Sequence, residues 1–183
     1  FMSMIGHNLL HQIVTEKAII DPAEILNNLH KGIQVALRQG NNEINTNDGM
    51  DVSIITINDV KKEVKWAGAN RPLILIDANG VLTKYDGDKF PVGGAQLDVE
   101  RTFTTKLVDV KIASMAYMFS DGYADQFGGD KGKKFMVRRF HDLLTTIHLY
   151  SAEQQQKVLQ ENFDDWRQGH EQVDDVLIVG IEI

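Results

Sequence analysis

The chain has 183 residues, a length that suits one domain with a sizeable buried core. Its 19 Lys and Arg against 26 Asp and Glu give a formal net charge of −7. Nucleic-acid binding is not expected, because a phosphate backbone requires a concentrated positive face. The one basic cluster, at residues 131–139, is expected on a solvated helix face. The absence of cysteine excludes disulfides and thiolate zinc sites.

Apolar residues at helical spacing predict two helices at the start of the chain, over residues 2–17 and 22–39. The second helix has a clear start signal, with Asp21 as N-cap and Pro22 at the first helical position. Gly40 is its expected C-cap, and a polar loop follows to residue 49.

From Met50 onward the hydrophobic period becomes two, which predicts strands. Short connections favour an antiparallel meander. Two further helices are expected, the second opened by a capping box of Ser151 and Gln154. The two helices are expected over 134–148 and 151–166. The last strand is expected to be buried on both faces. The predicted strands cover 50–57, 62–68, 72–77, 80–85, 100–109, 113–120 and 176–181. This order indicates an α+β fold, with sheets between helix layers, in a single domain over residues 1–183.

Three carboxylate clusters lie at the ends of predicted strands. They are Asp48 to Asp51, Asp121 to Asp125, and Asp174-Asp175. Each alone is explained equally well by a turn, since Asp-Gly is a common turn dipeptide. Asp174-Asp175 is harder to explain in that way, because adjacent like charges opening a buried strand are costly without a cation. Together the clusters indicate a site for a hard divalent cation, since Mg²⁺ and Mn²⁺ prefer carboxylate oxygens.

Competing motifs do not fit. The glycine- and lysine-rich stretch 128–134 has the wrong spacing for a phosphate-binding loop and lacks its Ser or Thr. His7 and His11 have helical zinc spacing but no evident third ligand. The sequence offers no nucleophile elbow and no thiol.

Five motifs in order resemble the SpoIIE-like branch of the metal-dependent (PPM-type) serine/threonine protein phosphatases. They are Asp48-Gly49-Met50-Asp51, Gly68-Ala69-Asn70-Arg71-Pro72-Leu73, Phe90-Pro91-Val92-Gly93-Gly94, Phe119 to Gln126, and Gln172-Val173-Asp174-Asp175-Val176. The resemblance implies an αββα sandwich of two antiparallel sheets flanked by helices. It also implies hydrolysis of phosphoserine or phosphothreonine by a water that bridges two Mn²⁺ or Mg²⁺ ions.

The same resemblance assigns the site residues. Asp121 and Asp174 match metal ligands, with Asp175 supporting them, and Asp125 matches the ligand of an additional, weaker metal. Asp51 or Asp48 would assist there, and the resemblance does not choose between them. Asp121 and Asp174 are therefore expected to meet at one edge of the sandwich, with Asp125 close by. Gly93 and Gly94 match a flap segment or, equally well, a simple turn.

Implied partners are a phosphorylated protein substrate, such as an anti-sigma-factor antagonist, an upstream sensory domain, and a second copy in a homodimer. The first two helices match the pair that couples regulatory input or dimerisation to the active site. A cytoplasmic location is expected, including the cytoplasmic part of a membrane-anchored sensor. The alternative function is a non-catalytic binding or dimerisation module on the same fold.

One family motif is missing. The first catalytic motif, Asp followed by Gly-His-Gly, has no match, since Gly-His occurs only at Gly6-His7 and Gly169-His170. The chain is therefore expected to be an N-terminally truncated and inactive domain. Its metal site is expected to be empty or partly filled, and one sheet edge is expected to lack its partner.

Overall fold

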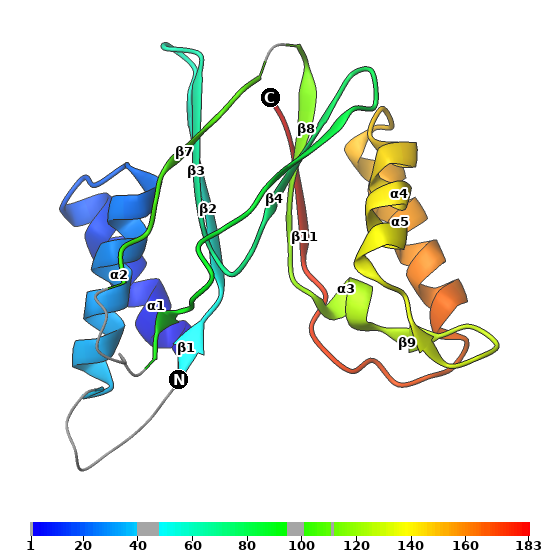
Figure 1. The fold of residues 1–183 in the computed structure, drawn as a ribbon, viewed down its shortest axis with the longest axis horizontal. Coiled ribbons are helices and arrows are strands. Elements are labelled where there is room, and N and C mark those ends of the chain that lie inside the picture. Colours follow the sequence, from blue (N-terminus) through cyan, green and yellow to red (C-terminus); the bar gives the residue numbers. More distant parts are fainter. Residues whose placement is uncertain (1, 40–47, 95–100, 111) are drawn as a thin grey trace. The chain divides into compact units, whose positions relative to one another are not determined.

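The computed structural model describes residues 2–39, 48–94, 101–110 and 112–183. They form two compact units. Unit 1 comprises the described residues up to Leu73 and those from Tyr85 to Asp109, and unit 2 comprises Ile74–Lys84 and Val110–Ile183. Each unit contains an antiparallel sheet and its own helices (Figure 1). The predicted α+β fold of antiparallel sheets with flanking helices is confirmed.

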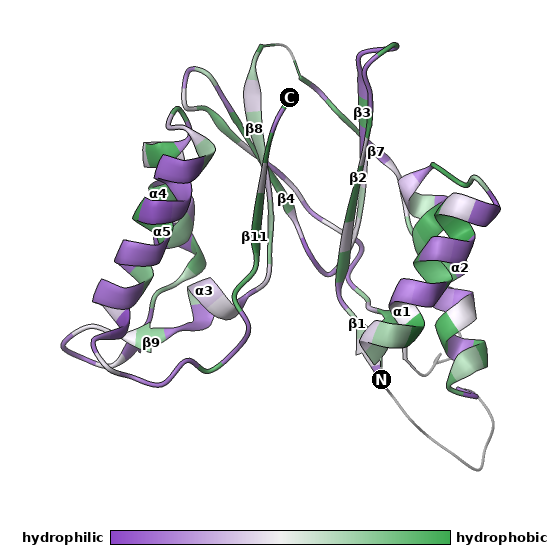
Figure 2. Ribbon diagram, turned by 180° about the vertical axis from the view of Figure 1, so that it is seen from behind, coloured by the Kyte–Doolittle hydropathy of each residue, from purple (hydrophilic) through white to green (hydrophobic). Residues whose placement is uncertain are grey.

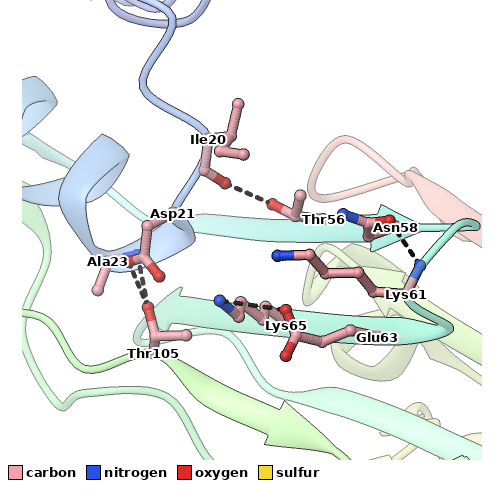
Figure 3. A network of polar contacts seen from close by, with 9 residues as sticks. All are labelled: Ile20, Asp21, Ala23, Thr56, Asn58, Lys61, Glu63, Lys65 and Thr105. Atoms are coloured by element: carbon pink, nitrogen blue, oxygen red, sulfur yellow. Dashed lines mark hydrogen bonds and ion pairs between the residues drawn. The ribbon is translucent and has the colours of Figure 1, made fainter.

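The helices of unit 1 begin where their sequence signals place them. Helix α1, Met2–His11, continues as a π-helical segment, η1, Gln12–Glu16, and α2 covers Pro22–Ala36. The Asp21 carboxylate accepts hydrogen bonds from the Ala23 and Glu24 amides at 3.1 and 3.2 Å. It also accepts one from the Thr105 hydroxyl at 2.6 Å, and Figure 3 shows Asp21 with Ala23 and Thr105. The N-cap of α2 therefore also ties the helix to a distant segment of unit 1. The predicted C-cap, Gly40, lies outside the described residues.

The main sheet of unit 1 has the order β2-β3-β7. Two very short strands, β1 and β6, pair separately. The strands are β1 Gly49–Met50, β2 Val52–Asn58, β3 Glu63–Ala69, β6 Val92–Gly93 and β7 Lys106–Val108. The buried core of unit 1 includes Ile13, Leu26, Leu29, Ile33, Ala67, Ala69, Val92 and Phe103.

Unit 2 has a four-stranded sheet of order β11-β8-β4-β5. The Ser151 capping box is confirmed at the start of α5. The elements of unit 2, with the end residues Leu73 and Tyr85 belonging to unit 1, are β4 Leu73–Asp77, β5 Leu82–Tyr85, β8 Ser114–Phe119, α3 Gly122–Asp125, β9 Phe127–Gly128, β10 Lys133–Lys134, α4 Val137–Ile147, α5 Ala152–Arg167 and β11 Ile178–Glu182. Its core includes Ile74, Ile76, Tyr117, Tyr123, Phe140, Leu144 and Phe163. In Figure 2, α4 and α5 carry both hydrophobic and hydrophilic residues, as expected of helices with one buried face.

The structure corrects three sequence predictions. The strands do not form one meander, because the chain leaves the first sheet after β3, pairs β4 in the second, and returns for β7. The helix predicted at 134–148 begins only at Val137, since Lys133 and Lys134 pair with β9. The final strand is not buried on both faces: Val179 is 37% exposed, and among the described strands β11 pairs only with β8. Alternating or continuous apolar patterns mark faces but do not name neighbours.

In the part of the chain that the structure describes, no helix combines the length and the apolar character needed to cross a membrane.

Candidate functional site

The end of β8 lies beside the segment that enters β11. The two strands are antiparallel neighbours, with Phe119 opposite Ile178. Beyond that pair, the Ser120 amide donates to the Leu177 carbonyl at 3.0 Å, and the Ser120 hydroxyl accepts from the Leu177 amide at 2.9 Å. The same hydroxyl donates to the Asp175 carbonyl at 2.8 Å. Ser120 therefore fixes the residue before Asp121 against the Asp174-Asp175 segment.

Gly122 permits an even closer approach at the same place. A Cβ atom at this position would lie 2.4 Å from the carbonyl oxygen of Asp175 and 3.3 Å from that of Asp174. Any side chain would push these two backbone segments apart. The glycine of this Asp-Gly pair is thus required by the packing of two segments, which the turn explanation did not anticipate.

The aspartates at this junction are exposed to solvent. Asp121 stands at the N-terminal end of α3, and its side chain makes no capping hydrogen bond there. Asp174 accepts a hydrogen bond from the Asp175 amide at 2.7 Å through Oδ1. The argument from a buried charge pair was wrong, because β11 begins only at Ile178 and both Asp174 and Asp175 are exposed. Water solvates these two carboxylates, so their proximity alone does not require a cation.

Asp125 is one helical turn beyond Asp121, and its amide donates to the Asp121 carbonyl at 2.9 Å. Its carboxylate forms an ion pair with Lys134, with 2.9 Å between Oδ2 and Nζ. Both side chains are a little under half exposed, so this pair contributes little to stability. A cation binding through Oδ2 of Asp125 would compete with the lysine.

Asp51 belongs to unit 1, and both of its carboxylate oxygens are engaged. The Asn70 side-chain amide donates to Oδ1 at 2.8 Å, and the Arg71 guanidinium lies 3.1 Å from Oδ2. Sequence reasoning identified the 48–51 and 68–73 motifs separately but missed that one holds the carboxylate of the other. Asp48 contributes its backbone carbonyl, which accepts from the Gly94 amide at 3.0 Å.

His30 is a residue of α2 that contacts the Gly93-Gly94 segment and that the sequence did not single out. It lies on the buried face of α2, is 3% exposed, and accepts a hydrogen bond from the Gly93 amide at 2.9 Å through Nδ1. Its Nε2 is buried and has no partner among the described residues. Burial lowers the pKa of His30, and the nearby charges of Arg101 and Lys31 lower it further. A histidine within an apolar helix stripe was the only available signal in the sequence.

The depressed pKa of His30 predicts a loss of stability in acid. The unfolded chain binds a proton near the ordinary value of 6.5, whereas folded His30 resists protonation. The free energy of unfolding should therefore fall as the pH decreases below 6.5, by at most about 1.4 kcal/mol per pH unit from this group. His30→Asn should reduce that slope, because Asn keeps an acceptor for the Gly93 amide without titrating. Urea unfolding between pH 5 and 8 measures it, with His30→Leu as the variant lacking the acceptor. An unchanged slope in His30→Asn would contradict this account.

The aspartates at the β8–β11 junction suit a hard divalent cation by ligand type, since their side chains offer carboxylate oxygens. The structure brings the backbones of Asp121, Asp125 and Asp174 into one part of unit 2 and places Asp51 in unit 1. No set of three or more His, Asp or Glu side chains within the described ranges is already arranged to hold a metal ion. The assignment of these four aspartates as ligands therefore stays a prediction.

The antiparallel sheets with their helices match the PP2C-type phosphatase fold. The chain is 21% identical to the "SiaA-PP2C domain of Pseudomonas aeruginosa", with a TM-score of 0.85. The match covers 100% of this chain and 69% of the SiaA domain chain. The phosphatase domain of SpoIIE from Bacillus subtilis gives 13% identity and a TM-score of 0.52, covering 100% and 73%. The Mycobacterium tuberculosis serine/threonine phosphatase PstP/Ppp gives 14% and 0.56, covering 98% and 81%. At these identities the similarities show the fold.

The family model for Stage II sporulation protein E (SpoIIE) matches residues 1–183. The chain therefore belongs to the SpoIIE family of PPM-type phosphatase domains. A search of curated proteins found no match.

Proposed function

We propose that this chain belongs to the phosphatase region of an intact protein that hydrolyses phosphoserine or phosphothreonine in a partner protein. The observation that supports this most is the junction of β8 and β11 in a SpoIIE-family fold. There Ser120 and Gly122 hold the Asp121 turn directly against the Asp174-Asp175 segment.

Asp121 and Asp174 would hold the metal, with Asp125 serving a further and weaker ion once Lys134 moves away. Bound Mn²⁺ or Mg²⁺ would supply a water of lowered pKa and neutralise phosphoryl oxygens. The chain's own contribution is positional. The Ser120 bonds keep the two acidic segments in register, and the Asp174 Oδ1 bond to the Asp175 amide restrains the orientation of that carboxylate.

The proposed substrate is a phosphorylated bacterial regulator of the anti-sigma-factor-antagonist type. The proposed setting is a cytoplasmic domain that receives a signal from an upstream sensor, with a homodimer as the functional assembly. These proposals rest on membership of the SpoIIE family and on the absence of cysteine.

A non-catalytic binding or dimerisation module is the alternative, and two ion pairs favour it. The Asp51 carboxylate is held by Arg71 and Asn70, and that of Asp125 by Lys134. The carboxylates of Asp51 and Asp125 thus pair with cationic side chains of the chain itself, as they would in a domain that uses the fold without a metal.

Metal removal separates the two functions. The intact protein that contains this chain should release phosphate from a phosphoserine protein in millimolar Mn²⁺. It should lose that activity in excess EDTA and regain it when Mn²⁺ is restored, because the water is activated only by the metal. Phosphate release is measured with a colorimetric assay. Turnover that persists in EDTA would contradict metal dependence, and no turnover at any Mn²⁺ concentration would favour the binding module.

A further inference from the structure

The strands β9 and β10 form a small hairpin immediately after α3. We call residues 127–136 the basic hairpin. In its register, Lys134 lies opposite Phe127 and Lys133 opposite Gly128. The Phe135 amide donates to the Gln126 carbonyl at 2.9 Å, and the Met136 amide donates to the Ala124 carbonyl at 2.8 Å. The returning strand is therefore fastened to the segment that carries Asp121 and Asp125.

The base of the basic hairpin is bonded to and packed against other residues of unit 2. Gln126 is fully buried, and its side-chain amide donates to the carbonyls of Phe127 and Glu171. The indole of Trp166 donates to the Gln126 carbonyl at 3.0 Å. At Gly128 a Cβ atom would lie 1.9 Å from the Trp166 carbonyl, so only glycine fits there. The hairpin is thus part of the packed structure and keeps a fixed position beside the predicted metal ligands.

The outer face of the basic hairpin combines charge with exposed apolar surface. Phe135 is 6% exposed and packs its ring against Tyr123, with 5.2 Å between centroids. Lys134 lies opposite Phe127 in the strand pair, and Met136 follows Phe135 where the hairpin ends. Met136 is 59% exposed and Phe127 is 40% exposed. The Lys134 ammonium lies 5.9 Å from the centre of the Phe127 ring while it pairs with Asp125.

Three further cations lie within the basic hairpin or directly after it, without an ion pair or hydrogen bond of their side chains in the described structure. They are Lys131, Lys133 and Arg138, and all are exposed. The exposed acid among them is Asp130. Because the chain as a whole carries −7, a local surplus of positive charge here would attract an anionic partner to this place rather than to the general surface.

Met136 has an unusual backbone conformation at the end of the basic hairpin. Its backbone has φ 80 and ψ 139, a conformation that residues other than glycine rarely adopt. Such a residue costs about 1–3 kcal/mol, and these outliers gather at ligand-binding segments. This conformation lies where the chain leaves the hairpin and enters α4, of which Met136 is the N-cap.

We propose that the basic hairpin is the docking surface for the phosphorylated segment of a protein substrate rich in acidic residues. Lys134 would exchange Asp125 for the incoming phosphate, Lys131, Lys133 and Arg138 would pair with flanking carboxylates, and Phe127 with Met136 would contact an apolar side chain. The proposal rests on the proposed phosphatase function and specifies its substrate class.

A binding experiment on the purified chain in EDTA tests the surface without catalysis. The probe is a fluorescent phosphoserine peptide with Asp and Glu on both sides, followed by anisotropy. The double variant Lys131→Glu/Lys133→Glu should weaken binding about tenfold, since each reversal removes one attraction and adds one repulsion. The matched control, Lys61→Glu/Lys62→Glu, reverses two exposed lysines of the β2–β3 turn and should change the Kd by less than about twofold. Equal Kd values for the two variants would overturn the proposal, as would equally tight binding of a single-stranded DNA of the same charge.

A kinetic experiment on the intact protein distinguishes failure of docking from failure of the proposed function. Lys131→Glu/Lys133→Glu should raise KM for the acidic phosphopeptide and leave its kcat and the hydrolysis of p-nitrophenyl phosphate unchanged. If the wild-type protein fails to hydrolyse p-nitrophenyl phosphate with Mn²⁺, the phosphatase function itself is wrong. If it hydrolyses this compound and KM for the phosphopeptide is the same in both double variants, only the docking surface is wrong.

Discussion

Asp121→Asn in the intact protein should lower kcat by orders of magnitude while the domain remains folded. The substitution removes a charged oxygen ligand from the predicted metal site, and the activation of water depends on that metal. Folding should be little affected, because Asp121 is exposed and substitutions at exposed positions change stability little. Asp174→Asn should likewise lower kcat, because it also removes a charged ligand. The domain should stay folded, since the new side-chain amide keeps an Oδ1 atom that can accept from the Asp175 amide. Phosphate release at saturating Mn²⁺ and a thermal melt measure the two quantities.

The control is Asp130→Asn, which neutralises an exposed aspartate of the basic hairpin and should keep wild-type kcat on p-nitrophenyl phosphate. Titration of Mn²⁺ by calorimetry gives a readout that does not depend on turnover. Asp121→Asn should weaken the binding of Mn²⁺, whereas Asp130→Asn should not. Wild-type activity in Asp121→Asn, with unchanged Mn²⁺ binding, would falsify the ligand assignment.

The second large effect concerns the 183 residues by themselves. As a purified chain they should show no measurable turnover of a phosphoserine peptide in millimolar Mn²⁺. They contain no Asp followed by Gly-His-Gly, the motif that the family resemblance assigns to the carboxylate touching both metals. Asp121 and Asp174 alone would hold one ion loosely, because Mg²⁺ gives up water reluctantly and requires well-placed ligands. The paired-metal activation of water would then be lost.

The comparison for this prediction is the same chain extended by a segment that carries the Asp and Gly-His-Gly motif. Both proteins are assayed at equal concentration after circular dichroism shows that each is folded. The extended protein should release phosphate at least about a hundredfold faster, as expected when a metal ligand is restored. Equal turnover would mean that the catalytic ligands lie among residues that this account has not assigned.

The sequence alone determined the local elements of this protein and its family. The caps at Asp21 and Ser151 placed the starts of α2 and α5, because a capping side chain acts on amides within three residues of itself. The change of the hydrophobic period to two near Met50 predicted the strands. The five motifs identified the PPM-type fold, and two of them contained Asp121 and Asp174.

Only the tertiary structure decided which of these segments meet. Ser120 and Asp175 are 55 residues apart in the sequence, and Asp51 and Asn70 are 19 apart. An alternating pattern gives the two faces of a strand but leaves its partner open, so the division of the strands into two sheets could not be derived from it. Exposure of Asp174-Asp175 also became evident only from the structure. Pairing of Lys134 with Asp125, nine residues apart, depends on the hairpin of β9 and β10, where the sequence had predicted a helix from residue 134. These contacts form because backbones that are distant in the sequence pack together and form hydrogen bonds. The residue types along one segment do not predict which other segment it will pair with.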